Sequence, residues 1–164
     1  MEQAVGAARF IVRKDAVQAA AALMLEQTGT IDMKQLAGAV GISRASLYRS
    51  YPDKLAVETS IAADLAKRMS AAADRHDGFV DRLQAVIEVL LEDPAGAAAL
   101  APVVAAVDFD LIAESAEVLV GRASAAPVII GFATLIASAH RRSALDEVRV
   151  VLDQTIAQYA ILPD

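Results

Sequence analysis

The chain has 164 residues, contains no cysteine and carries a formal net charge of -6 at pH 7. This length is enough to bury a substantial core in one domain, or in one domain with a small appendage. Without cysteine, disulfides, thiolate metal sites and cysteine nucleophiles are excluded. The first ten residues show no secretory signal pattern, so we expect a cytoplasmic protein.

The charge is distributed unevenly along the chain. Residues 1–55 carry seven Lys and Arg against five Asp and Glu, whereas residues 56–164 carry eight against sixteen. The N-terminal third is therefore weakly basic and the remainder strongly acidic. Only the N-terminal third is suited to approach a polyanion.

Helical spacing of apolar residues recurs along the chain, and alternating strand patterns are missing. The first helix is predicted over residues 8–27, with Gly29 as its stop signal. A short second helix follows up to Val40, because Asp32 and Gln35 have capping-box spacing and Gly41 ends the pattern.

Ser43 is placed to cap a third helix over residues 44–50, which Pro52 closes. Longer and more apolar helices are predicted after it, over residues 53–73, 79–93, 95–106, 110–122, 127–141 and 145–161. The sequence therefore predicts an all-α protein, with an N-terminal three-helix domain over residues 1–52 and a second helical domain over residues 53–164.

The longest uncharged run covers residues 123–140. It falls slightly short of the roughly 20 mostly apolar residues that span a bilayer. We expect a buried interface helix there and no membrane association.

The segment GISRASLYRSYPDK, residues 41–54, has the spacing of a helix-turn-helix unit. Its second helix would fit the roughly 12 Å wide major groove of B-DNA and present its N-terminal side chains to base edges. Arg44 is the best candidate to read guanine, because its guanidinium can bond two acceptors at once. The predicted DNA-binding residues are Lys34, Ser43, Arg44, Ala45, Ser46, Tyr48, Arg49, Tyr51 and Lys54. The alternative is an ordinary three-helix packing unit with Tyr48 and Tyr51 in its core.

The run MKQLAGAVGISRASLYRSYPDKLAV resembles the tetracycline-repressor (TetR) family of bacterial regulators. The resemblance is carried by Leu36-Ala37, Gly41-Ile42-Ser43, Leu47-Tyr48, Tyr51-Pro52 and Lys54. It is close over residues 9–55 and extends beyond them in helix number and order. It implies a helix-turn-helix DNA-binding domain followed by a ligand-binding and dimerisation domain. The implied function is a ligand-responsive repressor that binds a pseudo-palindromic double-stranded DNA operator as a homodimer.

The last two predicted helices carry apolar stripes suited to pairing in a four-helix bundle between two subunits. The predicted dimer-interface residues are Val128, Phe132, Leu135, Ile136, Val148, Leu152, Ile156 and Tyr159. Intramolecular core is the alternative, because periodicity cannot distinguish a partner from the same chain.

The resemblance also implies a pocket for a small, largely apolar effector. Candidate pocket residues are Phe79, Leu83, Phe109 and His140, although a histidine near a helix end is also a suitable C-terminal cap. No metal-ligand spacing, cofactor motif or catalytic motif is present, so no metal, no cofactor and no enzyme activity are predicted. Two alternatives remain: a small helical enzyme, and a protein-protein adaptor that has lost DNA binding, since Asp32 places a carboxylate near the expected phosphates.

Overall fold

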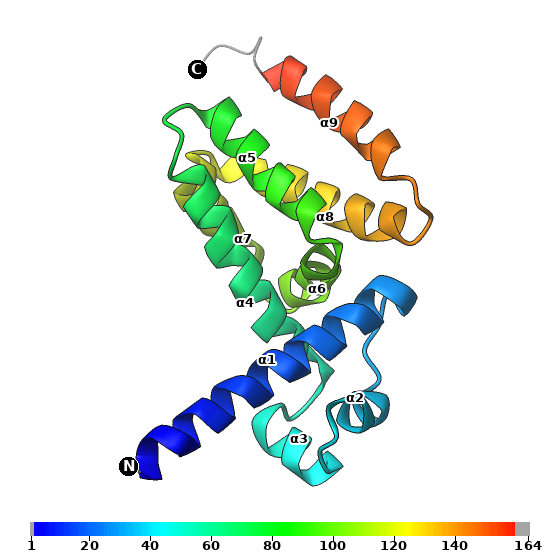
Figure 1. Cartoon of the computed structure of the whole chain (residues 1–164). Coiled ribbons are helices and arrows are strands. Elements are labelled where there is room, and N and C mark those ends of the chain that lie inside the picture. Colours follow the sequence, from blue (N-terminus) through cyan, green and yellow to red (C-terminus); the bar gives the residue numbers. More distant parts are fainter. Residues whose placement is uncertain (1, 160–164) are drawn as a thin grey trace.

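Within the residues that the structure describes, nine α-helices follow one another (Figure 1). The computed structural model describes the backbone of residues 2–159 and the side chains of residues 14–108 and 110–159, and these residues contain no strand. The helices are α1 (Glu2–Thr28), α2 (Met33–Val40), α3 (Arg44–Ser50), α4 (Lys54–Ala73), α5 (Phe79–Glu92), α6 (Pro94–Ala105), α7 (Phe109–Val120), the 3-10 helix η1 (Ala123–Ala125), α8 (Ala126–His140) and α9 (Leu145–Tyr159).

The all-helical prediction is confirmed, and the predicted helices agree closely with those observed. Only the start of α1 differs by more than two residues, because it begins at Glu2 and not near residue 8. The residues before Ala8 include Glu, Gln and Ala, which are good helix formers, so the helix continues through them. The predicted end of the last helix lies outside the described residues.

Short polar side chains begin several helices, which explains why the elements are so well delimited. Asp53, Asp93 and Asp108 each accept a hydrogen bond from a backbone amide in the first turn of α4, α6 and α7, respectively. Such an N-cap contributes about 1 kcal/mol to helix stability.

The N-terminal core is formed by α1, α2, α3 and the first half of α4. Its buried side chains include Val17, Leu25, Leu36, Leu47 and Val57. We call α1, α2 and α3 the N-terminal unit. In Figure 1, α2 and α3 lie together on one side of α1, at the opposite end of the molecule from α9.

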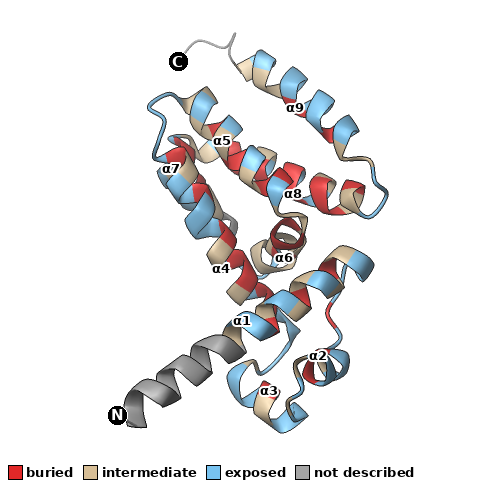
Figure 2. Ribbon diagram, viewed as in Figure 1, coloured by how far each residue is buried: buried red, intermediate tan, exposed pale blue. Residues whose placement is uncertain are grey.

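The C-terminal core extends from the second half of α4 to α9. Leu65, Leu83, Ile87, Leu90 and Ile136 are fully buried in it. Figure 2 shows these helices with buried residues on their facing sides and exposed residues outside. In α9 only Val148 and Leu152 are buried, so this helix covers one side of the bundle and leaves its outer face in solvent.

The two cores meet within α4, between Ile61 of the first and Leu65 of the second. Helix α6 also belongs to both, because Ala95 and Ala99 pack in the N-terminal core and Ala97 packs in the C-terminal core. The division between the two cores therefore falls inside α4. The domain boundary expected at residues 52–53 stays a prediction.

One described segment, Ala123–His140, is long and apolar enough to cross a membrane, with a mean hydropathy of 1.5 over 18 residues. It forms η1 and α8, and the structure buries one face of α8 in the C-terminal core, including Ile129, Phe132 and Ile136. Core helices of globular proteins combine these same properties. The predicted cytoplasmic location stays a prediction.

Candidate functional site

The turn between α2 and α3 is fixed by local hydrogen bonds. Asp32 caps α2 by accepting hydrogen bonds from the amides of Lys34 and Gln35, both at 2.8 Å. Gly41 ends α2 with a φ of 69°, in the left-handed region that favours glycine. The following amide, of Ile42, donates to the Ala37 carbonyl at 3.0 Å. These bonds set the direction in which the chain enters α3.

Ser43 then caps α3, as the sequence predicted. Its hydroxyl oxygen accepts a hydrogen bond from the Ser46 amide at 3.1 Å, and the two hydroxyls lie 2.9 Å apart. Leu47 is fully buried and anchors α3 to the N-terminal core, while Ile42 packs against that core from the turn. The short helix is thus held by one deeply buried side chain and its cap.

The rest of α3 forms a polar outer surface. Arg44, Ala45, Tyr48 and Arg49 are exposed, and Ser46 is half-buried. Tyr48 is 46% exposed, which contradicts the alternative that places its ring in the core. Among the described side chains, neither arginine has an ion-pair partner. Both guanidinium groups are therefore available to a ligand outside the chain.

The other predicted contact residues surround this surface. Lys34 is exposed in the first turn of α2, and Lys54 is the first residue of α4. Tyr51 is half-buried, packs against the N-terminal core and donates its amide to the Leu47 carbonyl at 2.8 Å. Its ring is thus partly structural, as the three-helix alternative expects.

Lys54 is connected to a buried carboxylate. Its Nζ lies 3.4 Å from Glu58 Oε1 and 3.5 Å from the Thr30 hydroxyl. Glu58 is only 2% exposed, and its Oε2 has no hydrogen-bond partner among the described atoms. Burial raises the pKa of the Glu58 carboxyl above its ordinary value of 4.5, Lys54 opposes this, and Asp53 adds to it. No sequence pattern singles out Glu58, because its burial depends on the helices that pack around α4.

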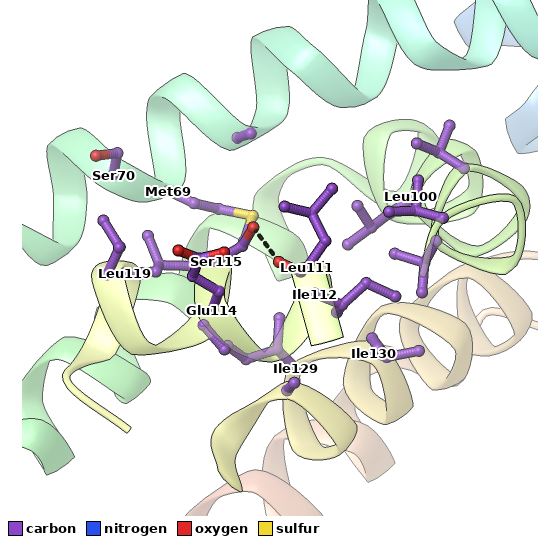
Figure 3. Close-up of a pocket in the computed structure, with 17 residues that line it drawn as sticks. Met69, Ser70, Leu100, Leu111, Ile112, Glu114, Ser115, Leu119, Ile129 and Ile130 are labelled. Atoms are coloured by element: carbon purple, nitrogen blue, oxygen red, sulfur yellow. Dashed lines mark hydrogen bonds between the residues drawn. The ribbon is translucent and has the colours of Figure 1, made fainter. Parts of the chain in front are cut away.

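A cleft of about 660 Å³ lies between α4, α6, α7 and α8, and Figure 3 shows side chains from these helices converging on it. Most lining residues are apolar, and the polar ones are Ser70, Glu114 and Ser115. The described lining residues are Ala66, Met69, Ser70, Leu100, Val103, Val104, Val107, Leu111, Ile112, Glu114, Ser115, Ala116, Val118, Leu119, Ala126, Ile129 and Ile130.

The predicted pocket residues whose side chains are described do not line this cleft. Leu83 is fully buried in the C-terminal core, and His140 is the last residue of α8. Phe79 packs edge-on against Tyr159, with ring centroids 5.7 Å apart. The guanidinium carbon of Arg122 lies 4.5 Å from the centre of the Phe79 ring. The side chain of Phe109 lies outside the described residues. The only sequence signal for the cleft was the apolar richness of residues 100–119, which equally fits a core.

The predicted dimer-interface residues divide into two groups. Phe132, Ile136, Val148 and Leu152 are buried by their own chain, so the structure assigns these four to the intramolecular core. Val128, Leu135, Ile156 and Tyr159 are half-buried at its edge. Val150 and Val151 of α9 are exposed, at 56% and 44%, and were not singled out from the sequence.

No group of three or more His, Asp or Glu side chains close enough to hold a metal ion occurs among the described residues. No model of a known protein family matches the chain, and no curated protein matches it.

Proposed function

We propose that this chain is a sequence-specific DNA-binding transcriptional regulator that acts as a homodimer in the cytoplasm, as its resemblance to the TetR family implies. The observation that carries the proposal is the outer surface of α3. Arg44, Tyr48 and Arg49 are exposed there, and the buried Leu47 fixes the helix from behind.

The chemistry of this surface suits the major groove. A short helix that enters the groove by its N-terminal end would place Arg44 against a base edge, where a guanidinium bonds the O6 and N7 acceptors of guanine. The hydroxyl of Tyr48 and the ammonium groups of Lys34 and Lys54 would contact phosphates on either side. Phosphate contacts fix the register, whereas the arginine supplies base preference.

The proposal of a homodimer is based on the small size of α3, the helix that would contact the bases. Helix α3 has seven residues, so one copy contacts only a few base pairs. Two copies about 34 Å apart would read two half-sites of a pseudo-palindrome, which is the usual route to specificity for such units. Two exposed valines of α9, Val150 and Val151, offer apolar contacts on the end of the molecule away from α3.

Ligand-responsive repression is the sense of regulation that we propose. Helices α4 and α6 line the cleft, and both also pack in the N-terminal core. A ligand that prefers one position of these helices would change the spacing of the two α3 helices and lower operator affinity. The ligand would act by shifting the population of dimers between two arrangements of the α3 helices.

The test is selection of duplexes from a random-sequence DNA pool by the purified protein at stated salt concentration, with the molar mass measured by light scattering. We expect enrichment of a pseudo-palindrome bound by a dimer. Weak binding without enrichment, lost at moderate salt, would overturn the proposal and favour the adaptor alternative.

A further inference from the structure

The cleft between α4, α6, α7 and α8 differs from a packed core in that its apolar walls reach solvent. Leu111 and Val118 of α7 are 54% and 77% exposed, although both line the cleft. Its volume of about 660 Å³ lies within the roughly 300–1,000 Å³ of small-molecule sites. An apolar ligand would remove these side chains from water, which favours its binding.

The walls are aliphatic. Met69, Leu100, Ile112 and Ile129 are typical of the described lining, which contains no aromatic ring. The described walls therefore offer no stacking surface of the kind that recognises planar ring systems. Flexible alkyl chains fit such walls, because methylene groups need only apolar contact and no defined orientation.

Two of the three polar residues of the described lining, Glu114 and Ser115, offer hydrogen-bond acceptors to the cleft. The Ser115 hydroxyl donates to the Leu111 carbonyl at 2.7 Å, as drawn in Figure 3, so its remaining capacity is to accept. Glu114 is the only charged residue in the described lining and has no ion pair with another described side chain. Glu114 is exposed, so a ligand bound here meets a hydrated negative charge at the edge of an apolar wall.

Cations next to the described lining already have carboxylate partners. Arg82 of α5 donates to the carbonyls of the lining residues Val118 and Leu119, and its guanidinium lies 3.7 Å from Asp74. Lys67 pairs with Asp64 at 3.0 Å, and Arg68 pairs with Asp93. An anionic ligand would therefore face Glu114 without a free cation on the adjoining turn of α4, whereas a cationic ligand would gain a partner.

From the aliphatic walls and the single carboxylate of Glu114, we infer that the cleft binds an aliphatic molecule with a cationic head group, such as an alkyl amine or a quaternary alkyl ammonium. Its role as the effector rests on the proposed function, whereas its binding to the cleft does not.

The test uses isothermal titration calorimetry of the full chain without DNA. The probes are decyltrimethylammonium, decanoate and tetramethylammonium, each below any micelle-forming concentration. We expect saturable binding of one decyltrimethylammonium per chain, weaker binding of decanoate and none of tetramethylammonium. Equal affinity for the two decyl compounds would overturn the charge selectivity, and no saturable binding of either would overturn the site.

Two variants locate the binding. Glu114→Gln should weaken decyltrimethylammonium binding about twofold to fivefold and leave decanoate binding no weaker, because an exposed ion pair contributes modestly. The control Glu117→Gln alters an exposed carboxylate on the same helix outside the described lining and should change neither affinity. Equal effects of the two variants would show general attraction to an acidic surface and overturn the assignment to Glu114.

Val104→Trp adds an indole to the α6 wall and should abolish binding of both decyl compounds while the far-UV circular dichroism spectrum is retained. Retained binding would place the ligand outside the cleft. A failed DNA selection with successful calorimetry would remove the regulatory role alone, and the reverse result would remove only the ligand assignment.

Discussion

Arg44 is the residue on which base preference depends in the proposed function. It is the first residue of α3, is exposed and has no ion pair among the described side chains. We expect Arg44→Ala to weaken operator binding by about 1–3 kcal/mol and to relax the preference at one base pair. Fluorescence anisotropy with the selected operator and its single-base variants measures both effects.

A matched control is Arg75→Ala, which removes an exposed arginine in the loop between α4 and α5. This substitution should leave base preference unchanged. If Arg44→Ala weakens all sequences equally, Arg44 contacts phosphate and not a base edge.

Glu58 should make stability depend on pH. Burial raises the pKa of its carboxyl in the folded chain, so the folded state binds this proton more tightly than the unfolded state does. Its contribution to stability is therefore full below the unfolded pKa and is lost as pH rises through the folded pKa. The glutamine in the Glu58→Gln variant carries no titratable proton. The free energy of unfolding of this variant should therefore rise relative to that of the original chain as pH increases above about 4.5.

Urea unfolding of both proteins at a series of pH values measures this difference. Glu92→Gln is the control, because Glu92 is exposed near the end of α5 and should leave the pH dependence unaltered. A constant difference between the Glu58 variant and the original chain across the pH series would contradict the explanation from burial.

At the scale of the elements, one polar side chain joins α1 to α4. Gln18 Nε2 lies 3.0 Å from the Ser60 carbonyl, 2.9 Å from the Ser60 hydroxyl and 2.8 Å from Asp64 Oδ2, and donates to these oxygens. Hydrogen bonds from Lys67 and Gln18 lower the pKa of Asp64. The bonds hold α4 against the helix that supports α2 and α3.

Gln18→Ala should lower the free energy of unfolding by about 1–2 kcal/mol, because hydrogen bonds to carbonyl and carboxylate oxygens are lost together. It should also raise the pKa of Asp64, which titration by NMR can follow. Gln27→Ala, at an exposed position of the same helix, should change neither quantity. An unchanged pKa of Asp64 in the Gln18 variant would show that this bond is not maintained in solution.

Elements specified by neighbouring residues were predictable from the sequence. The bounds of α2 and α3 follow from Asp32, Gly41 and Ser43, whose effects on the backbone reach only a few residues. The exposed arginines of α3 follow from the same helical register. Leu47 is buried on the inner side of the same helix.

Features assembled from distant helices were not predictable in this way. Aromatic type suggested Phe79 as a pocket wall, but contacts with Tyr159 and Arg122 hold it at the edge of the core. The apolar stripe that includes Ile136 could have packed against a second subunit or within its own chain. The packing of α5 against α8 shows that Ile136 belongs to the intramolecular core. The cleft depends on four helices and has no local signature.

At the scale of the whole molecule, α3 and α9 lie at opposite ends, so one end could bind DNA while the other holds a second copy. Leu152 packs on the inner side of α9, and its neighbour Val151 is 44% exposed. A helix with an exposed apolar position beside a buried one offers two faces, one for its own core and one for a partner.

Substitutions at Val151 and Leu152 test dimerisation and folding separately. Val151→Glu should yield a monomer by analytical ultracentrifugation with its helical circular dichroism spectrum retained, because two-fold symmetry would bring like charges together at the interface. Leu152→Ala should instead lower the free energy of unfolding by about 2–5 kcal/mol and leave the mass of the folded protein that of a dimer. If Val151→Glu remains dimeric, the second copy binds elsewhere, and the two α3 helices must be spaced by another surface of the molecule.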